Sequence, residues 1–589
     1  MRKYLTFLIV FCSVTFNTQT FNYERTWATH IGPVDSFIDK IFFDNQNNIY
    51  TEGIAYNSTN GSSSVPISYY NQFVNPGLQG FTTGFVNNAS AKISPNAATL
   101  LSYFYNPPGK KIYHRERNGN YYQREFYTSP ITVNSNVWLT SNVESSNNEI
   151  ILAKYNANNI LQWRTYIPTL SEVKTDNEGN IYISGSTYWQ SLGDIGTAFP
   201  SYTFPNINGN LVKPNVYVAK LNPQGEKIWA TYIPSQNYTD FDVNNGNVFV
   251  ITNDEINASD ANLATAGTFQ QTKIKGAITK LNASNGSRIW GTYYGFSSSS
   301  TVDRIVASED AVYIIGTIST ASGNPGSYYA TSGAFKTQIG GNSDYYFTKF
   351  NQSGIRVWGT YYGTPTDEYF IGATGNLCLS GDKLLFAYLQ SGTYNYSTPG
   401  AYQTTKPSSM PDIAFTMFST NGNRIVTSYY GGPPPANNNI GWAARAKFSE
   451  TEDAFYLFGA TNSQSGHTTP GSLQQNMIFP NSNNEGIGTY LAKFSVKSLS
   501  TSETSVATDL QLFDNPNNGK FSLKGKILQT ENCSFKIYDL SGRFVTEEKL
   551  SNNELQQFNY HEILKTGNYI LSVLNSDNNL IKNFKMTVK

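Results

Sequence analysis

The amino-acid sequence predicts an all-β fold, in which a seven-bladed β-propeller closed by its N-terminal strand precedes a small C-terminal β-sandwich. Three observations lead to this prediction. The 589 residues include 41 Tyr, 36 Phe and 47 Gly, and aromatic residues favour strands while Gly favours turns. A four-residue phrase beginning with Trp recurs along the chain, which indicates a repeat fold. From Asp509 onwards a different pattern of strands and turns begins, and the phrase does not recur.

The first 20 residues are typical of a Sec-type signal peptide. Arg2 and Lys3 precede an apolar run from Leu5 to Val14. That run is too short to span a bilayer, which takes ~20 apolar residues, and no other segment is long and apolar enough. We therefore expect a secreted chain without a transmembrane segment, although the sequence does not fix the cleavage site.

The repeated phrase is Trp-x-Thr-Tyr, and each copy is predicted to form the last strand of one blade. Degenerate copies begin at Leu100 and Val426. A buried Trp removes ~150–250 Å² from water, so we interpret the Trp as packing one blade against the next. The structural Trp residues of the repeat are Trp27, Trp163, Trp229, Trp290 and Trp358.

Each unit is predicted to hold four antiparallel strands, as a propeller blade requires. A weak strand comes first, followed by a Tyr-rich run such as 179–185, a strand around a Lys such as Lys220, a tight turn and the Trp strand. The last unit ends at Lys493 without a Trp strand, whereas residues 26–31 have no unit before them. We therefore expect residues 26–31 to pair with residues 491–496, which closes the ring and removes free sheet edges. The predicted propeller covers residues 21–497.

These units resemble the SBBP family of bacterial β-propeller repeats. The shared elements are Trp-x-Thr-Tyr, Gly-Asn-x-Tyr and Lys-Leu-Asn, together with a loop of the Gly-Ala-Phe-Gln type. That loop is found at 267–270, 333–336, 400–403 and 471–474. The resemblance covers about residues 27–495 and implies a propeller fold, but it does not imply a ligand.

After the repeats, a Ser/Thr-rich linker is expected at 498–508, followed by a β-sandwich at 509–589. Three motifs of strands bounded by turns mark that segment. They contain Asn515, Pro516 and Gly519, then Tyr538 and Gly542, then Gly567 and Tyr569.

This segment resembles the type A C-terminal sorting domain of the type IX secretion system of Bacteroidetes-type bacteria, although Asp514 replaces the first Pro of the usual Pro-Asn-Pro. The resemblance implies passage through the periplasm and recognition by the type IX machinery. Release from the outer surface of a Gram-negative cell, or attachment to it, would follow.

Charge and motifs exclude several functions. With 41 basic and 41 acidic residues, the chain lacks the basic excess that a nucleic-acid partner requires. The four His residues show no metal-binding spacing, and neither a nucleophile elbow nor a phosphate loop is found. Acidic turns at Asp44 and Asp176 are interpreted as β-turns, since a calcium loop needs more carboxylates. We expect no catalytic residue, no metal site and no cofactor, and a buried thiol at Cys378.

The candidate binding surface is an insertion at 112–126, where Arg and Tyr alternate. On a loop, such residues would stack on sugars or hold a protein partner. The alternative is a solvated hairpin without a ligand. The candidate binding residues are Tyr113, Arg115, Arg117, Tyr121, Tyr122 and Arg124.

Three functional hypotheses remain open. The first is a non-enzymatic binding or interaction protein, secreted or on the cell surface, whose ligand is a glycan or a surface protein. The second is an extracellular polysaccharide hydrolase or lyase with its site at the propeller mouth, which would need two carboxylates ~5–10 Å apart. The third is a structural surface component without a discrete ligand.

Overall fold

A computed structural model provides the structure of the chain. It describes residues 21–56, 66–82, 86–127, 149–187, 196–197, 206–207, 210–211, 215–235, 237–253, 262–365, 376–408, 411–432, 441–479, 486–497, 510–530, 532–539, 543–576 and 580–589. The chain divides into two compact units, one ending at Val496 and one beginning at Lys497. The predicted signal peptide and the predicted linker at 498–508 lie outside the described residues.

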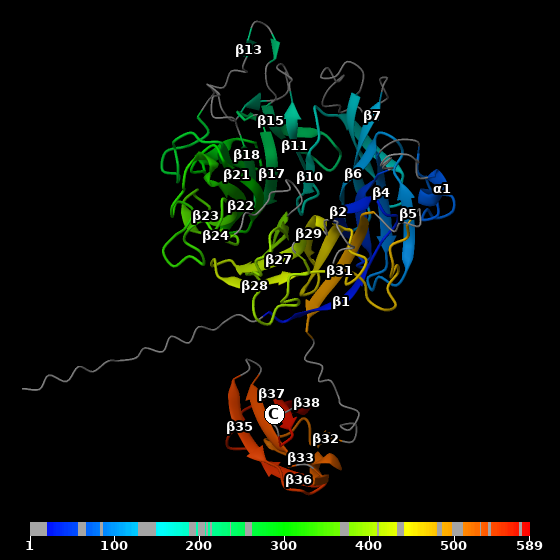
Figure 1. Cartoon of the computed structure of the whole chain (residues 1–589), viewed down its shortest axis with the longest axis vertical. Coiled ribbons are helices and arrows are strands. Elements are labelled where there is room, and N and C mark those ends of the chain that lie inside the picture. The colour runs from blue at the N-terminus through cyan, green and yellow to red at the C-terminus, as the bar shows by residue number, and fades with distance from the viewer. Residues whose placement is uncertain are drawn as a thin grey trace, which may run out of the picture. The chain divides into compact units, whose positions relative to one another are not determined.

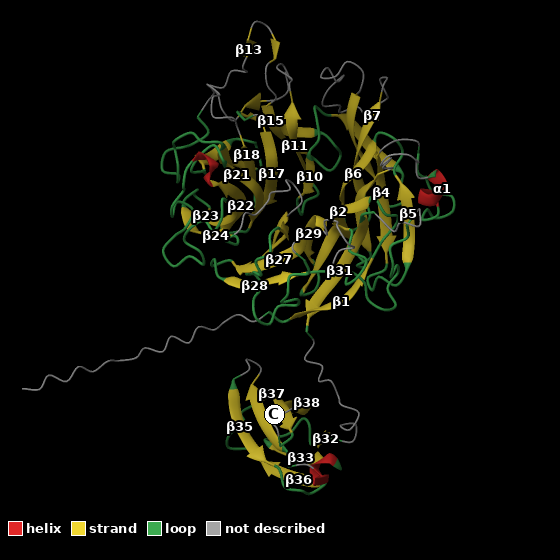
Figure 2. Ribbon diagram, in the orientation of Figure 1, coloured by secondary structure: helices red, strands yellow, loops and turns green. Residues whose placement is uncertain are grey.

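The described part of the first unit contains seven sheets built on four antiparallel strands, numbered here in chain order (Figures 1 and 2). Sheet one is β2 (Ser36–Phe43), β3 (Ile49–Tyr56), β4 (Val86–Ile93) and β5 (Leu100–Tyr105). Sheet two is β6 (Lys110–Arg115), β7 (Tyr121–Tyr127), β8 (Glu149–Tyr155) and β9 (Leu161–Tyr166). Sheet three is β10 (Glu172–Thr175), β11 (Ile181–Thr187), β15 (Asn215–Leu221) and β16 (Lys227–Ile233), with β12 (Gly196–Thr197) added in parallel to β16.

The remaining sheets repeat this order. Sheet four is β17 (Asn237–Asn244), β18 (Asn247–Asn253), β19 (Gly276–Asn282) and β20 (Arg288–Tyr293). Sheet five is β21 (Ser300–Ala307), β22 (Ala311–Ser319), β23 (Ser343–Asn351) and β24 (Arg356–Tyr362). Sheet six is β25 (Asn376–Ser380), β26 (Lys383–Gln390), β27 (Asp412–Ser419) and β28 (Arg424–Tyr429). Sheet seven is β29 (Gly441–Phe448), β30 (Ala454–Thr461), β31 (Gly488–Val496) and, from the other end of the unit, β1 (Tyr23–Thr29).

Short elements lie in the connections. They are the helix α1 (Ile67–Asn71), a 3₁₀ turn at Thr320–Ser322 and a small hairpin of β13 (Asn206–Ile207) and β14 (Asn210–Leu211).

The pairing of β1 with β31 is antiparallel. Tyr23 lies opposite Val496, Trp27 opposite Lys493, and Thr29 opposite Leu491. The first described strand of the chain is therefore hydrogen-bonded to the last strand of the unit. Without β1, the edge of β31 would be open for pairing with other chains.

The first strands of the sheets contact one another in sequence. β2 contacts β6, β6 contacts β10, β10 contacts β17, β17 contacts β21, β21 contacts β25, β25 contacts β29, and β29 contacts β2. The series returns to its starting strand, so the contacts of the seven first strands form a cycle.

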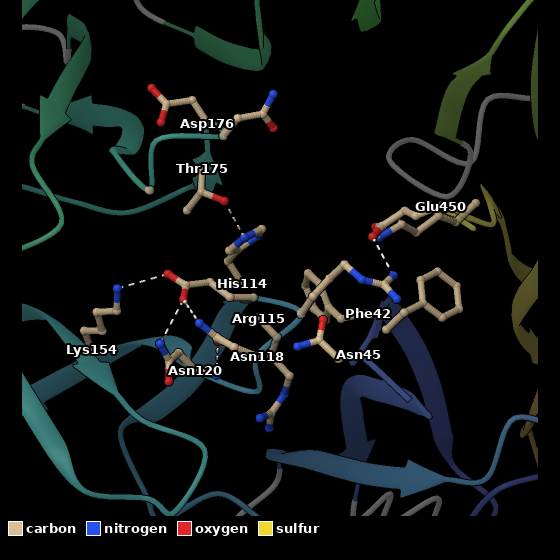
Figure 3. Close-up of a pocket in the computed structure, with 16 residues that line it drawn as sticks. Phe42, Asn45, His114, Arg115, Asn118, Asn120, Lys154, Thr175, Asp176 and Glu450 are labelled. Atoms are coloured by element: carbon tan, nitrogen blue, oxygen red, sulfur yellow. Dashed lines mark hydrogen bonds and ion pairs between the residues drawn. The ribbon is translucent and has the colours of Figure 1, made fainter. Parts of the chain in front are cut away.

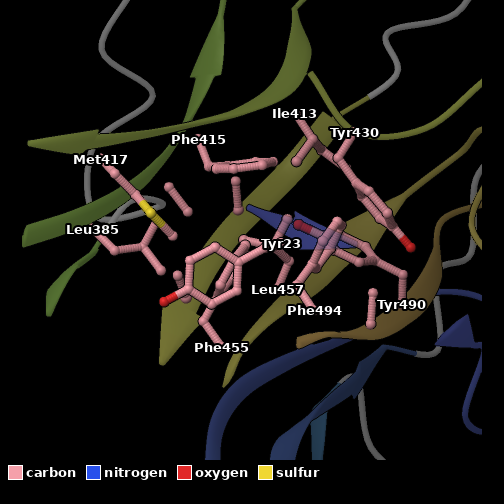
Figure 4. Close-up of a cluster of buried hydrophobic side chains, with 14 of the residues drawn as sticks. Tyr23, Leu385, Ile413, Phe415, Met417, Tyr430, Phe455, Leu457, Tyr490 and Phe494 are labelled. Carbon is pink, nitrogen blue, oxygen red and sulfur yellow. The ribbon is translucent and has the colours of Figure 1, made fainter. Parts of the chain in front are cut away.

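The apolar core lies between neighbouring sheets. In the cluster between sheets six and seven, Phe415 packs near Phe455, and the rings of Phe455 and Phe494 stack at 4.8 Å (Figure 4). Tyr23 of β1 belongs to the same cluster and is 2 % exposed. The N-terminal strand therefore adds apolar contacts as well as hydrogen bonds.

Each repeat Trp links its sheet to the next one. The indole Nε1 of Trp163 in sheet two donates to the carbonyl of Pro223 in sheet three at 2.9 Å, and Trp229 donates to Ala283 in sheet four at 3.0 Å. Gly225, which has a φ of +85°, lies beneath the Trp163 ring, where a Cβ atom would come within 2.6 Å of the indole. The turn therefore requires Gly both for its backbone and for the close approach of the ring. The same indole bond joins Trp27 to Pro95, Trp290 to Gln352 and Trp358 to Thr420.

One copy of the phrase is offset from its predicted position. In five sheets the Trp lies opposite the central Lys of the third strand, as Trp229 lies opposite Lys220. In sheet one the residue opposite Lys92 is Ser102, so the phrase begins two residues later than the predicted Leu100. Tyr103, which the prediction placed at the end of the phrase, therefore stands at its second position.

The outer edge of most sheets is covered by the connection between the second and third strands. In sheet four, Thr265 N donates to Gly291 O at 2.9 Å and Tyr293 N donates to Gln270 O at 3.0 Å. The loops of the Gly-Ala-Phe-Gln type make the equivalent bonds in sheets five, six and seven. This covering protects an edge that would otherwise pair with another chain.

The second unit consists of two sheets and a short helix, α2 (Ile527–Thr530). One sheet holds β32 (Gln511–Phe513), β33 (Lys520–Lys524) and β36 (Leu555–Asn559). The other has the order β35 (Phe544–Lys549), β34 (Ser534–Asp539), β37 (Gly567–Leu574) and β38 (Leu580–Val588). Side chains of both sheets, including Phe521, Phe535 and Leu571, form one apolar cluster, as in a β-sandwich.

Candidate binding cavities in the first unit

The predicted binding segment at 112–126 is a strand hairpin and not a loop. Its residues form most of β6 and β7, the first two strands of sheet two. Tyr113, Arg115, Tyr121 and Tyr122 are each less than 9 % exposed. The alternation of Arg and Tyr thus reflects the two-residue period of a strand. The prediction of an exposed loop was wrong on this point.

Contacts within the unit explain the burial of these side chains. Arg115 Nε donates to Glu52 Oε1 at 2.6 Å, and its guanidinium lies between the rings of Tyr50 and Tyr121 at 4.5 and 4.9 Å. Arg124 lies over Phe126 at 4.4 Å. Of the six predicted residues, Arg115 and Arg117 line one cavity and Tyr113 lines a second.

The first cavity, called the mouth cavity here, has a volume of about 730 Å³. It lies where the turns between the first and second strands of sheets seven, one, two and three come together (Figure 3). Its wall includes Asn45, Arg117, Asp176 and Glu450, one from each of these turns. Phe42 and Phe43 border the cavity but are only 7 % and 4 % exposed, and Lys447 Nζ lies 5.4 and 5.2 Å from their rings.

Ion pairs fix the charged groups of the mouth cavity. Arg117 Nη1 contacts Glu450 Oε2 at 3.0 Å, and Lys447 Nζ contacts Glu450 Oε1 at 3.1 Å. Burial opposes ionisation of Glu450, but the charges of Lys447 and Arg117 outweigh it and lower the pKa of that carboxyl. Glu116 is held by Lys154 at 3.0 Å and accepts hydrogen bonds from the side chains of Asn118 and Asn120.

The acidic turns at Asp44 and Asp176 are closed by their own carboxylates. Asp176 Oδ1 accepts from Asn180 N at 2.9 Å, and Asp44 Oδ1 accepts from Asn48 N at 2.8 Å. Lys92 also lies 2.9 Å from Asp44. Both carboxylates therefore stabilise the turns in which they lie.

The second cavity, called the channel cavity here, has a volume of about 630 Å³ and is lined by residues of all seven first strands. It adjoins the mouth cavity, because Phe42, His114, Thr175 and Lys447 line both. One lining residue from each of these strands, in chain order, is Lys40, Lys111, Glu172, Asp240, Arg304, Asn376 and Arg445.

The channel cavity is strongly charged. Six basic and four acidic residues line it. Lys40 pairs with Glu172 at 2.5 Å and Lys174 pairs with Asp242 at 2.8 Å. Asp39 lies between two cations, at 2.8 Å from Arg445 and 3.6 Å from Lys111.

Burial and neighbouring charges shift the pKa values in opposite directions. Burial would raise the pKa of Asp39, but Arg445 and Lys111 outweigh it and lower that pKa. For Asp240 burial dominates and raises the pKa despite Lys174 and Arg304. The pKa of Lys111 is lowered by burial.

His114 lies at the junction of the two cavities. Its Nε2 is 3.0 Å from Thr175 Oγ1. Burial, with the charges of Lys447 and Lys40, lowers the pKa of His114 to about 3. The imidazole is therefore neutral near pH 7, and it contributes a hydrogen-bonding group without a charge.

The carboxylates in the described walls of the two cavities are all engaged. Asp39, Glu172, Asp242, Glu116 and Glu450 have cationic partners. Asp240 accepts hydrogen bonds from the amides of Phe241 and Ile305. Cys378 also lines the channel cavity, and burial raises the pKa of its thiol to about 12, which disfavours the thiolate.

The first predicted sorting motif forms a turn in the second unit, which side-chain hydrogen bonds hold in place. Asn515 Nδ2 donates to Lys585 O at 2.6 Å, and Asn515 Oδ1 accepts from Thr587 N at 2.8 Å. Pro516 follows this residue, and Gly519, with a φ of +89°, donates through its backbone N to Asn517 Oδ1.

The other two motifs lie in the larger sheet of that unit. Tyr538 is on β34, where its ring is 6.0 Å from Phe544, and Gly567 begins β37. Tyr569 OH donates to Lys565 O at 2.9 Å. Gly542 lies outside the described residues.

In the described ranges, no helix has the length and apolar character needed to cross a membrane.

Comparison with known proteins identifies the second unit. Residues 511–587 match the family model described as "Secretion system C-terminal sorting domain". The match confirms the predicted C-terminal sorting domain and indicates secretion through the type IX system, to the cell surface or the extracellular space. No curated protein matches the chain in sequence.

Several solved propellers are similar to the chain at low sequence identity. The β-propeller domain of the Trilobed protease from Pyrococcus furiosus is 6 % identical, with a TM-score of 0.29, and the match covers 60 % of this chain and 78 % of that one. The C-terminal WD40 domain of Sif2 is 8 % identical, with a TM-score of 0.32 and coverages of 80 % and 99 %. The WD40 domain of SCAP from fission yeast is 7 % identical, with a TM-score of 0.30 and coverages of 81 % and 98 %.

Proposed function

We propose that this chain is an exported glycan-binding protein whose first unit is a seven-bladed SBBP-type propeller closed by its N-terminal strand. In this proposal the mouth cavity is the binding site, and the sorting domain directs the protein to the outside of the cell. The architecture is supported by the cycle of contacts among the first strands and by the pairing of β1 with β31.

The observation that carries the binding function is the mouth cavity itself. Its polar groups are held in place by ion pairs such as Arg117–Glu450, and its wall presents amide, carboxylate and guanidinium groups. A sugar presents several hydroxyl groups, each both a donor and an acceptor, so it matches a wall of fixed polar groups. The volume of about 730 Å³ is within the usual range of ~300–1,000 Å³ for ligand pockets.

The engagement of the carboxylates favours binding over hydrolysis. Glycoside cleavage needs one carboxylic acid that donates a proton and a second carboxylate that acts as base or nucleophile. Burial raises the pKa of Asp240, which suits an acid, but both oxygens of that residue accept hydrogen bonds from main-chain amides. A hydrolase assay with the Asp240→Asn variant therefore belongs to the test.

The experiment is a glycan array probed with residues 21–589. We expect a defined subset of glycans to bind, and Arg117→Ala to weaken that binding because it removes a donor from the wall. Arg543→Ala removes an equivalent surface ion pair, at 3.0 Å from Asp539, from the second unit and serves as the matched control. A blank array would overturn the glycan proposal, and glycan cleavage abolished by Asp240→Asn would replace it with the hydrolase.

The export function has a separate test. Removing residues 510–589 should leave the first unit folded and keep the protein inside the cell, since the sorting domain is missing. Normal export of this truncated chain would contradict the role given to the second unit.

A further inference from the structure

We propose that the channel cavity receives an anionic group, so that the ligand of the mouth cavity is an acidic glycan whose carboxylate enters the channel. This inference rests on the proposed function, because it names the class of glycan that the same site would select.

The first argument is the balance of charge in the channel cavity. Six basic residues face four acidic ones, although the whole chain has no net charge. Lys447 is paired with Glu450 of the mouth cavity, which leaves five basic residues for four acidic ones and therefore one excess cation in the channel cavity. Such a cavity focuses the field and favours an anion inside it.

The second argument is the arrangement around Asp39. This single carboxylate serves both Arg445 and Lys111, which leaves one positive charge uncompensated within that group of three. Arg445 Nε is buried and has no hydrogen-bond partner among the described residues. A carboxylate that approaches the Arg445 guanidinium and the Lys111 ammonium would neutralise the local charge, and hydrogen bonds of this charged kind are among the stronger ones.

The opposite side of the cavity is already neutralised. Asp242 pairs with Lys174 and accepts from Ala307 N at 2.8 Å, while Asp240 accepts from Ile305 N. The acidic group of a ligand would therefore be directed towards β2, β6 and β29, the strands that carry Lys40, Lys111 and Arg445.

The third argument is the continuity between the two cavities. Lys447 and His114 line both of them, so a chain of sugars in the mouth cavity can place one substituent in the channel cavity. His114 is neutral near pH 7 and adds no charge at this junction. Lys447 adds a cation at the same junction, where its Nζ lies 3.1 Å from Glu450 Oε1. A glycan with an acid on one residue fits both cavities better than a neutral glycan.

The experiment compares an acidic glycan with its neutral methyl ester. Oligogalacturonate and its fully methyl-esterified form are titrated calorimetrically into residues 21–589. We expect the free acid to bind about tenfold more tightly, which corresponds to ~1.4 kcal/mol, because only the acid can pair with the uncompensated cation. That preference should shrink in 0.5 M NaCl.

The variant for this test is Lys111→Met, because Asp39 retains Arg445 as a partner and the fold should survive. We expect the preference for the acid to be largely lost while affinity for the ester is unchanged. Lys111→Arg keeps the charge and should keep the preference. Lys349→Met, which removes a Lys paired with Asp310 at 3.4 Å and absent from both cavity walls, is the matched control.

The outcomes separate this inference from the proposed function. Equal affinity for acid and ester overturns the inference and leaves glycan binding intact, whereas no binding to any glycan on the array overturns both. A sulfated oligosaccharide that binds more tightly than the carboxylate, with the same loss in Lys111→Met, supports the anion site and identifies sulfate as its occupant. A preference for the acid that persists in Lys111→Met contradicts the assigned position.

Discussion

The outer strands and the first strands of the seven sheets use their side chains in opposite ways. On the outer strands the same contact recurs, since Trp163, Trp229, Trp290 and Trp358 each donate to a carbonyl in the following sheet. On the first strands the lining residues differ from sheet to sheet, and most of them are polar or charged. We therefore expect the repeated outer contacts to stabilise the fold, and the varied inner surface to carry the selectivity that the proposed binding function requires.

The strongest test of this division is deletion of residues 21–32. It removes β1, exposes the edge of β31 and deletes Trp27, whose loss alone should cost ~3–5 kcal/mol. We expect the first unit to unfold at a much lower temperature, or not to fold, as measured by circular dichroism. Deleting residues 510–589 instead should leave this transition in place. Unchanged melting after the N-terminal deletion would contradict closure by β1.

A single outer contact should have the next largest effect. Trp229→Ala removes a large buried side chain and its bond to Ala283 O, and we expect a loss of ~3–5 kcal/mol in the free energy of unfolding. Ser102→Ala changes the equivalent position of sheet one, where no Trp is present, and should cost less than ~0.5 kcal/mol. Denaturant unfolding measures both, and similar losses would remove the special role of the Trp.

Acidification should destabilise the first unit at both regions. Burial lowers the pKa of His30 and His467, which lie near β1, and of His114 at the channel. The unfolded chain therefore takes up protons below about pH 6.5 that the folded chain does not bind. Stability is full above that pH and falls as the pH drops, by up to ~1.4 kcal/mol per pH unit for each histidine.

Urea unfolding between pH 7.5 and 5 measures this loss. We expect His467→Gln to reduce the slope, whereas His561→Gln, at an exposed position of the second unit, serves as the control. A slope that is the same in His467→Gln and the parent chain would show that this buried histidine does not contribute.

The smallest effect on stability is expected at the mouth cavity. Arg117→Ala breaks the contact with Glu450 and the hydrogen bonds from Arg117 Nη2 to Asp44 O and Asn47 Oδ1, but the side chains of Arg117 and Glu450 are 32 % and 43 % exposed. Ion pairs at such positions stabilise by ~0–1 kcal/mol, so thermal unfolding should change little. A large loss would show that the inner surface also holds the fold together, and the division between the two regions would fail.

The same division explains what the sequence could predict. The outer strands were predictable because five of the seven sheets meet the same packing requirement with the same residues, as in Trp290-Gly-Thr-Tyr293 and its turn partner. In sheet one the predicted register was wrong. Ser102 occupies the position of the Trp there, and the prediction placed Tyr103 at the end of the phrase.

The candidate site was not predictable in this way. Its residues come one or a few at a time from seven weak strands, so neither spacing nor periodicity connects Lys40, Glu172 and Arg445. The alternating Arg and Tyr of residues 112–126 did identify a segment that borders both cavities, but the period of two indicated a strand with buried side chains. Only the arrangement of the sheets shows which of these side chains reach a cavity.

The distance along the chain between β1 and its partner has a consequence for export. More than 450 residues separate Trp27 from Lys493, so β1 cannot pair with β31 until nearly the whole first unit has been synthesised. A polypeptide that emerges with its amino end first must keep Tyr23 and Trp27 in solvent, or bound to a chaperone, for most of its passage. Completion of the first unit therefore waits for β31. A chain truncated before β31 would leave β1 without its partner, and an unpaired strand can pair with other chains.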